Sequence, residues 1–354
     1  MRLINNSINS IKHLAQIIFD TTHKKIWREI TVLNNGLKDK HLKVVVGIHS
    51  TNPIMPMNQP EIESLSDYAL VFHGKIFSIE LNEYLLNNIK QIRKRYPNLL
   101  IILSTYEMKL KDHSCLIELG VVVVYNKDVG ELPTPYPKSI CQQIETVNSG
   151  LSFAVSQRKK YSIKIRVDQN IIAEDLIRKC FTMQTMFQNN IKDCSRIFTT
   201  SYSSYAHRAL GVSDMFMFGE TSDLLKYWGT AKPDDYLIQM KKLQKKYKAL
   251  EWNKFLIPET WLAARYLDNL GINLEDPGLV TAYAWHEFFG IIDASSLGLS
   301  WFKTNDWLLT NKLTREWFSS DFKSGMVELY FIDWLSNYYF SDNVDLKTVI
   351  IPGA

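Results

Sequence analysis

The middle of the chain alternates short apolar runs with longer segments that have the periodicity of a helix. Runs that are apolar almost throughout are typical of strands covered on both faces of a sheet, and four of them occur, at Leu70–Phe72, Leu99–Leu103, Val121–Tyr125 and Met215–Phe218. Segments with apolar side chains at helical spacing lie between the first three, at Leu81–Arg95 and Ser114–Leu119. Alternating strands and helices imply right-handed crossovers. The sequence therefore predicts an α/β domain with a mostly parallel central sheet.

The segment 161–170 reads as a further strand, with one apolar and one polar face. Its side chains alternate with the period of two that a pleated strand requires, as Ile163, Ile165 and Val167 alternate with Lys164, Arg166 and Asp168. Ligands bind beyond the carboxyl ends of strands in open α/β sheets. At that position Asp168 could hold a metal ion or a ribose, and Arg166 could bind a phosphate or that carboxylate. The alternative is a polar strand face that ends in a turn.

The chain divides into three predicted parts. Residues 1–60 form an N-terminal extension with one or two amphipathic helices, a strand, and the basic side chains Lys12, Lys24, Lys25 and Arg28. These helices could pack on the core or lie on a membrane surface. Residues 61–300 form the α/β core, with further helices expected at 138–158, at 174–187, from 221 or 222, and from 258. The C-terminal third of the chain is rich in aromatic side chains and is expected to be helical, and its last part, residues 301–354, is expected to pack on the core.

Composition excludes some classes of protein. The chain has 354 residues, of which 46% are hydrophobic, and a net charge of +4, so it is not a dedicated nucleic-acid binder. The four cysteines form no C-x-x-C pair and no zinc-site spacing, which favours a reduced, cytoplasmic protein. The apolar runs are too short for a membrane span, and the first residues are too polar for a secretory signal.

Several single residues are candidates for chemistry. Asp214 precedes an apolar run, where a charge suggests a functional or a capping role, and Glu259 opens a helix after Pro258. The positive end of that helix is expected to lower the pKa of Glu259. Gly74 follows a predicted strand and would let a nucleotide approach the backbone, whereas a plain turn glycine explains it equally well. His286 lies in A-W-H-E-F-F, which lacks the second histidine of the zinc-protease motif.

The ordered set of these segments resembles the WavE family of lipopolysaccharide-core synthesis proteins. The matching pieces cover about residues 65–270 and appear in the family's order, as V-F-H-G-K-I, Y-P-N-L-L-I-I-L-S-T, Q-Q-I-E-T-V-N-S-G-L, K-I-R-V-D, S-D-M-F-M-F-G and P-E-T-W-L. The resemblance implies a single domain similar to glycosyltransferases of the GT-A type. It also implies transfer of a sugar from a nucleotide donor to a lipopolysaccharide-core, capsule or other surface-glycan acceptor.

The resemblance implies roles for the candidate residues as well. Those expected to bind the donor are Gly74, Ser104, Lys164, Arg166 and Asp168. A divalent cation, Mg or Mn, would be held by Asp168 and His286. The D-Q-N segment after the strand offers only one carboxylate, so Arg166 and Lys164 could neutralise the diphosphate instead. Glu259 is expected to be the general base and Asp214 to orient the substrate.

The location follows from the acceptor. The resemblance implies a lipid-linked acceptor, so the protein is expected to be cytoplasmic with peripheral contact between its basic N-terminal segment and the inner membrane. Two other hypotheses remain open, namely a nucleotidyl- or phospho-sugar transferase and an inactive scaffold in an assembly complex. They are separated from the leading hypothesis by whether Asp168, Asp214 and Glu259 converge on one cleft.

Overall fold

The computed structural model describes residues 65–106, 114–132, 139–173, 175–189, 191, 193–205, 208–229, 233–246, 258–302 and 328–339. All of them belong to one compact unit, which takes in residues 52–305 and 322–354. The predicted N-terminal extension and most of 301–354 lie outside the described residues, so what the sequence predicts there stays a prediction. None of the helices within the described ranges is long and apolar enough to cross a membrane.

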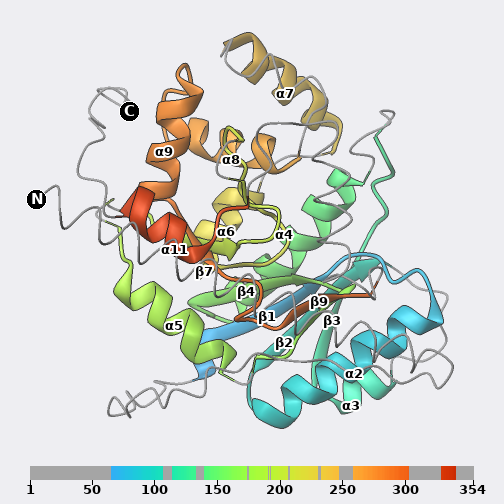
Figure 1. The fold of residues 1–354 in the computed structure, drawn as a ribbon. Helices are drawn as coiled ribbons and strands as arrows, with labels where there is room; N and C mark the ends of the chain where they lie inside the picture. The colour runs from blue at the N-terminus through green and yellow to red at the C-terminus, as the bar shows by residue number, and fades with distance from the viewer. Residues whose placement is uncertain are drawn as a thin grey trace, which may run out of the picture. The chain divides into compact units, whose positions relative to one another are not determined.

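A seven-stranded sheet in the order β3-β2-β1-β4-β7-β6-β8 forms the centre of the described structure (Figure 1). Its strands are β1 (Tyr68–His73), β2 (Leu100–Tyr106), β3 (Val121–Asn126), β4 (Tyr161–Arg166), β6 (Ile197–Thr200), β7 (Met217–Glu220) and β8 (Phe289–Ile292). β7 is antiparallel to both of its neighbours, and the other six strands share one direction. The predicted α/β class with a mostly parallel sheet is confirmed.

The direction of the crossovers decides which face each helix covers. The chain moves outward from β1 through α2 (Ile79–Arg95) to β2, and through α3 (Ser114–Glu118) to β3. It then returns through α4 (Ile140–Ser156) to β4, on the other side of β1. Right-handed crossovers that lead in opposite directions along a sheet place their helices on opposite faces. α2 and α3 therefore lie on one face of the sheet and α4 lies on the other (Figure 1). The strand order thus reverses between β1 and β4, and ligands bind at such a switch point.

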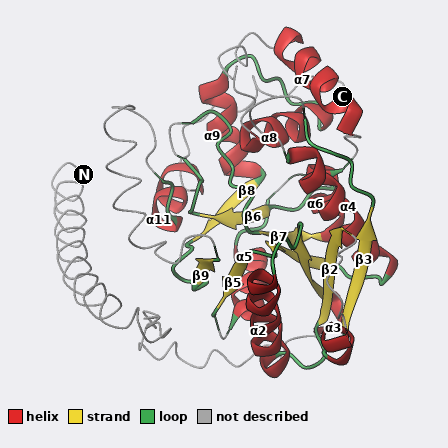
Figure 2. Ribbon diagram, turned by 90° about the vertical axis from the view of Figure 1, so that its right-hand side faces the viewer, coloured by secondary structure: helices red, strands yellow, loops and turns green. Residues whose placement is uncertain are grey.

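The remaining elements surround this frame. They are η2 (Leu65–Asp67), β5 (Gln169–Ile171), α5 (Leu176–Met186), α6 (Thr221–Trp228), α7 (Pro233–Lys246), α8 (Pro258–Asn269), α9 (Pro277–Glu287), β9 (Leu299–Trp301), α11 (Phe331–Trp334) and η4 (Leu335–Tyr339). β5 and β9 pair as a separate two-stranded sheet (Figure 2). α6 packs on α4 and on α8.

Three local predictions differ from the structure. The run expected as a strand at Met215–Phe218 enters β7 only at Met217, because Ser213 Oγ accepts from the Met215 amide in a turn. β4 ends at Arg166, although the expected alternation of apolar and polar side chains continues to Asp168, since the chain turns toward β5. The aromatic C-terminal third was expected to be helical, but it also contains the strands β8 and β9. Strands of three or four residues are too short to show a periodicity.

α4 lies unusually close to the sheet at Gly150. A Cβ atom there would lie 2.5 Å from Val71 Cγ1 and 3.1 Å from Ser104 Cβ, both of which belong to neighbouring strands. We therefore expect Gly150→Ala to lower the free energy of unfolding by about 1–3 kcal/mol, the usual cost of overpacking a core. Denaturant unfolding measures this loss.

Gly278→Ala is the matched control for that substitution. It adds the same methyl group in a helix, but its Cβ would meet only Asp276 Oδ1, at an ordinary 3.5 Å. We expect no loss of stability there, because alanine has the higher helix propensity. Equal midpoints for the two variants would contradict close packing of α4 on the sheet.

Candidate functional site

The candidate site lies where β1 and β4 end side by side. The Val167 amide donates to the His73 carbonyl oxygen at 3.0 Å, and the Gly74 amide donates to the Ser104 carbonyl oxygen at 3.1 Å. Gly74 has φ +121°, a conformation in which an L side chain is strained. The glycine therefore lets the chain leave β1 tightly at this edge, next to the residues that follow β4.

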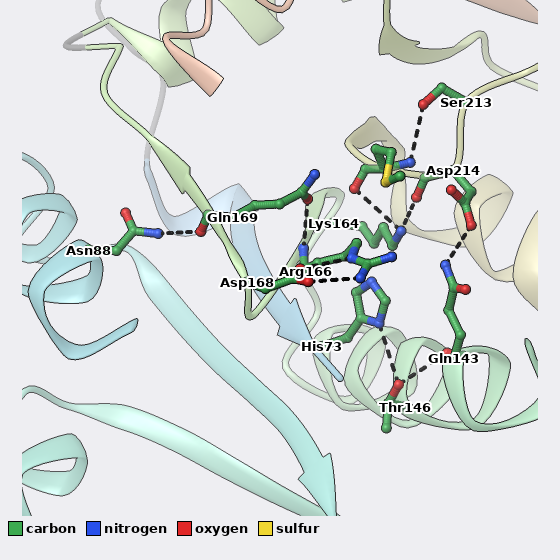
Figure 3. Close-up of polar contacts among 11 residues, drawn as sticks. His73, Asn88, Gln143, Thr146, Lys164, Arg166, Asp168, Gln169, Ser213 and Asp214 are labelled. Atoms are coloured by element: carbon green, nitrogen blue, oxygen red, sulfur yellow. Dashed lines mark hydrogen bonds and ion pairs between the residues drawn. The ribbon is translucent and has the colours of Figure 1, made fainter. Parts of the chain in front are cut away.

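Arg166 and Asp168 form a bidentate ion pair at the end of β4 (Figure 3). Arg166 Nε donates to Asp168 Oδ1 and Nη2 donates to Oδ2, each at 2.9 Å. The Asp168 side chain is 4% exposed and the Arg166 side chain 29% exposed. Both carboxylate oxygens thus face the guanidinium, and the Arg166 side chain is partly exposed.

The turn that carries this pair is fixed from two sides. Gln169 Oε1 accepts from the Arg166 amide at 3.1 Å, which closes the turn after β4. Asn88 Nδ2 on α2 donates to the Gln169 carbonyl oxygen at 2.9 Å (Figure 3). The orientation of Arg166 and Asp168 therefore depends on contacts with a helix far away in sequence.

Lys164 lies beneath this pair and is fully buried. Its Nζ donates to the carbonyl oxygens of Asp214 and Met215 and lies 4.5 Å from the ring centre of Trp228 on α6. Burial lowers the pKa of Lys164 to about 7, although the nearby Asp214 carboxylate opposes the shift. The polar face of β4 is covered by α4 and α6, so the amine holds the Asp214 loop and does not reach the surface.

His73, at the end of β1, is part of the same buried layer. Its Nδ1 lies 3.4 Å from Thr146 Oγ1 on α4, and its ring is 6.3 Å from that of Trp228. Burial lowers the pKa of His73 well below its ordinary value, and the charges of Lys164 and Arg166 lower it further. We infer that His73 is neutral at physiological pH.

Asp214 is held by its side chain and by its backbone. Gln143 Nε2 on α4 donates to Asp214 Oδ2 at 2.6 Å (Figure 3). Thr199 Oγ1 donates to the neighbouring Ser213 carbonyl oxygen at 2.6 Å, and Ser204 Oγ accepts from the Ser213 amide at 3.2 Å. The Asp214 carboxylate is therefore oriented by α4, whereas the backbone of the turn is held by the hydroxyl groups of Thr199 and Ser204.

Glu259, in the first turn of α8, has a strongly perturbed carboxylate. Burial, and then the charge of Asp214, raise the pKa of Glu259 to about 7, although Arg208 and Arg166 oppose the rise. Its Oε2 is shielded from solvent and has no hydrogen-bond partner among the described residues. The net shift of this pKa is therefore opposite to the expected one, because burial and the Asp214 carboxylate outweigh the lowering by the backbone hydrogen bond at the start of the helix.

The structure brings most of the predicted site residues together. The charge of Asp214 acts on Lys164 and on Glu259, and that of Arg166 also acts on Glu259, so these groups share one cluster. Asp168 joins it through its ion pair with Arg166, and Gly74 lies at the adjacent strand end. Asp168, Asp214 and Glu259 thus belong to one group of charged side chains.

Ser104 and His286 do not join the cluster. Ser104 is fully buried beneath α4, where its Oγ accepts from Asn126 Nδ2 at 3.0 Å. His286 lies in the last turn of α9, just before β8, and its Nδ1 lies 2.9 Å from Glu287 Oε1. β8 runs in the same direction as β4, so His286 lies at the amino edge of the sheet and Asp168 at the carboxyl edge.

The predicted metal ligands therefore do not fit one ion. Asp168 and His286 lie at opposite edges of the sheet, and Arg166 engages both Asp168 oxygens. Across the described ranges, no group of three or more His, Cys, Asp or Glu side chains could hold a metal ion. The role of a divalent cation stays a prediction.

Sequence reasoning missed three residues of the cluster. Gln143 orients Asp214, His73 lines the buried layer, and Arg208 lies 4.3 Å over the Tyr205 ring while its charge acts on Glu259. The one available signal was His73, because a histidine at the end of an apolar run is unusual. Gln143 looks like any polar position of a helix until α4 is placed beside Asp214.

Comparison with family models identifies the family of the chain. The model of a family described as WavE lipopolysaccharide synthesis matches residues 80–290, which is more than half of the chain. The matched range contains β2, β3, β4, β6 and β7, together with Arg166, Asp168, Asp214 and Glu259. Comparison with curated proteins gives no significant match.

Two solved structures are similar at a low level. A cytidylyltransferase from Leptospira borgpetersenii serovar Hardjo-bovis (strain JB197) has 11% identity and a TM-score of 0.31, over 46% of this chain. The chain covers 63% of the length of that enzyme. A protein described as a nucleotide-diphospho-sugar transferase, from Desulfovibrio desulfuricans G20, has 6% identity and a TM-score of 0.30, over 64% of this chain and 80% of its own.

Proposed function

The chain belongs to the WavE lipopolysaccharide synthesis family, and from this premise we propose that it is a glycosyltransferase. It would move a sugar from a nucleotide donor to a lipopolysaccharide-core or other surface-glycan acceptor. The observation that carries the proposal is the convergence of Arg166, Asp214 and Glu259 at the carboxyl edge of β1 and β4. A cation beside a carboxylate that titrates near neutrality suits a reaction in which a diphosphate leaves and a hydroxyl loses its proton.

The proposal assigns the donor to the β1 side of the site. The leaving nucleoside diphosphate needs positive charge, and the half-buried guanidinium of Arg166 supplies it next to the tight turn at Gly74. Asp168 holds that guanidinium in place through two hydrogen bonds, so it acts as a positioning residue. We assign Lys164 to the support of the Asp214 loop, because its amine is buried and bonded to backbone carbonyls.

The proposal assigns proton transfer to Glu259. The acceptor hydroxyl oxygen attacks the anomeric carbon of the donor sugar and forms the new glycosidic bond. Its proton passes to Glu259 as the bond from the anomeric carbon to the diphosphate oxygen breaks, and that electron pair leaves with the nucleoside diphosphate. Asp214, held by Gln143, accepts a hydrogen bond from the acceptor and orients it. A carboxylate with a raised pKa is well suited to this task.

Product analysis tests the proposal against its alternatives. We expect at least one of a panel of UDP-, GDP-, CMP- and dTDP-sugars to raise the melting temperature of the protein. With a glycan acceptor, that donor should release its nucleotide while the acceptor gains one sugar. Release of pyrophosphate from a nucleoside triphosphate and a sugar phosphate would instead indicate a nucleotidyltransferase. A protein that binds none of these compounds would be a scaffold.

A further inference from the structure

Two adjacent aromatic residues at the end of β9 face opposite sides of the candidate site. The ring of Trp301 lies 4.9 Å from that of Tyr202, at 72°. The Arg166 guanidinium lies 6.0 Å from the same Trp301 ring. The ring of Phe302 lies instead 5.4 Å from that of Tyr84 and 6.5 Å from that of Phe77. Successive residues of a strand point to opposite faces, so Trp301 and Phe302 belong to two different surfaces.

The backbone fixes Trp301 relative to the Arg166–Asp168 pair. β9 is antiparallel to β5, and Trp301 lies opposite Gln169, the residue that follows Asp168. The Phe302 amide donates to the Asp168 carbonyl oxygen at 2.8 Å. Asp168 and Gln169 are therefore both tied to β9, which keeps the backbone of Trp301 next to the ion pair (Figure 2).

The position of Tyr202 indicates that the Trp301–Tyr202 pair lies on the same side of Arg166 as Asp214. Tyr202 follows β6, and the same connection leads to Asp214, with Ser204 Oγ accepting from the Ser213 amide to tie its two ends together. Gly74, on the proposed donor side, follows β1, which lies on the other side of β4. The Trp301–Tyr202 pair and Gly74 therefore lie on opposite sides of Arg166.

The chemistry of the pair fits a sugar ring. Trp301 and Tyr202 are both partly exposed. Their rings meet at 72° and form an apolar corner beside the Arg166 guanidinium. A pyranose has C–H groups on a ring face and hydroxyl groups around its edge. An aromatic face with a few polar groups at its rim is the usual way to hold such a ligand.

We propose that Trp301 and Tyr202 form the acceptor subsite, in which a pyranose ring of the acceptor stacks on the indole while its reacting hydroxyl faces Glu259 and Asp214. The inference rests on the proposed function and adds the class of acceptor group and the residues that hold it. The competing ligand is the nucleobase of the donor, which also stacks on aromatic rings. Removing the indole distinguishes the two ligands, because it should weaken binding of the acceptor sugar in the first case and binding of the sugar nucleotide in the second.

Saturation-transfer NMR with the methyl β-glycosides of glucose, galactose and N-acetylglucosamine tests the subsite. We expect at least one glycoside to receive saturation mainly at the axial C–H groups of one ring face. Trp301→Ala should weaken this binding about tenfold, the size expected for loss of an aromatic stack. Trp301→Phe should retain most of it. Tyr125→Ala is the control, because it removes a half-exposed aromatic ring from β3, three strands away from β4.

Donor binding, measured by thermal shift with sugar nucleotides, separates this inference from the proposed function. We expect Trp301→Ala to bind the donor as the wild type does. The inference is overturned if no glycoside is saturated, if saturation is unchanged in Trp301→Ala, or if that variant loses donor affinity instead, which would assign the indole to the nucleobase. If no sugar nucleotide binds the wild type while glycoside binding still depends on Trp301, the donor half of the proposed function fails and the subsite stands.

Discussion

Glu259→Gln is expected to reduce turnover by about 10²- to 10⁴-fold, the usual contribution of a general base. The amide keeps the shape of the side chain but cannot accept the hydroxyl proton. Donor affinity should stay near the wild-type value, because Glu259 is proposed to act on the acceptor. Steady-state kinetics with both substrates varied, together with a separate donor-binding measurement, gives the comparison.

The pH dependence offers a second test of Glu259. Its pKa is raised to about 7 by burial and by Asp214, and the base must be ionised to act. We therefore expect kcat/KM of the wild type to rise with pH through about 7, and this rise to disappear in Glu259→Gln. Stability should change in the opposite direction. Between its ordinary pKa and the raised one, the folded state holds more protons, so the contribution of Glu259 to stability is lost as pH rises through 7.

Two further variants make the assignment falsifiable. Asp214→Asn removes the neighbouring charge, and Glu220→Gln repeats the Glu259 substitution at the opposite edge of the sheet, where β7 ends. We expect Glu220→Gln to be fully active. If Glu259→Gln keeps near-normal turnover while Asp214→Asn loses it without losing donor affinity, the base is Asp214 and the roles are reversed.

Asp168→Ala is expected to abolish transfer and also to destabilise the protein. It leaves the Arg166 guanidinium without the carboxylate that receives two of its N–H groups. Removing one partner of a buried ion pair costs about 3–5 kcal/mol, and the 29% exposure of Arg166 points to the low end of that range. Denaturant unfolding measures the loss, and activity must be assayed well below the midpoint of the variant.

Asp175→Ala provides the control for that experiment. Asp175 pairs with Arg178 and Lys179 on the surface of α5, at 3.0 Å in both cases. Exposed pairs of this kind contribute less than about 1 kcal/mol, so we expect a small loss of stability and full activity. If Asp168→Ala were no less stable than Asp175→Ala, the ion pair would not organise the site.

The order of strands and helices could be predicted from the sequence because covering both faces of a parallel sheet requires continuous apolar runs. β1 and β2 follow this rule, whereas β3 is an equally apolar run at the edge of the sheet and is only partly covered. The alternation of strand and helix predicts the parallel direction of all three. The direction of β7 could not be predicted, because a strand's apolar pattern is the same whichever way it runs. Its reversal follows from the connection after β6, which contains no crossover helix among its described residues.

The sequence by itself determined which residues could do the chemistry, through carboxylates and an arginine placed at the ends of apolar runs. Only the tertiary structure decided how they act. Lys164 lies on the polar face of β4, but α4 and α6 cover that face, so the amine is buried. Glu259 begins a helix, which by itself lowers a pKa, yet burial and the charge of Asp214 raise it to about 7. Burial and charges that are distant along the chain depend on which segments pack together, and local sequence patterns do not contain that information.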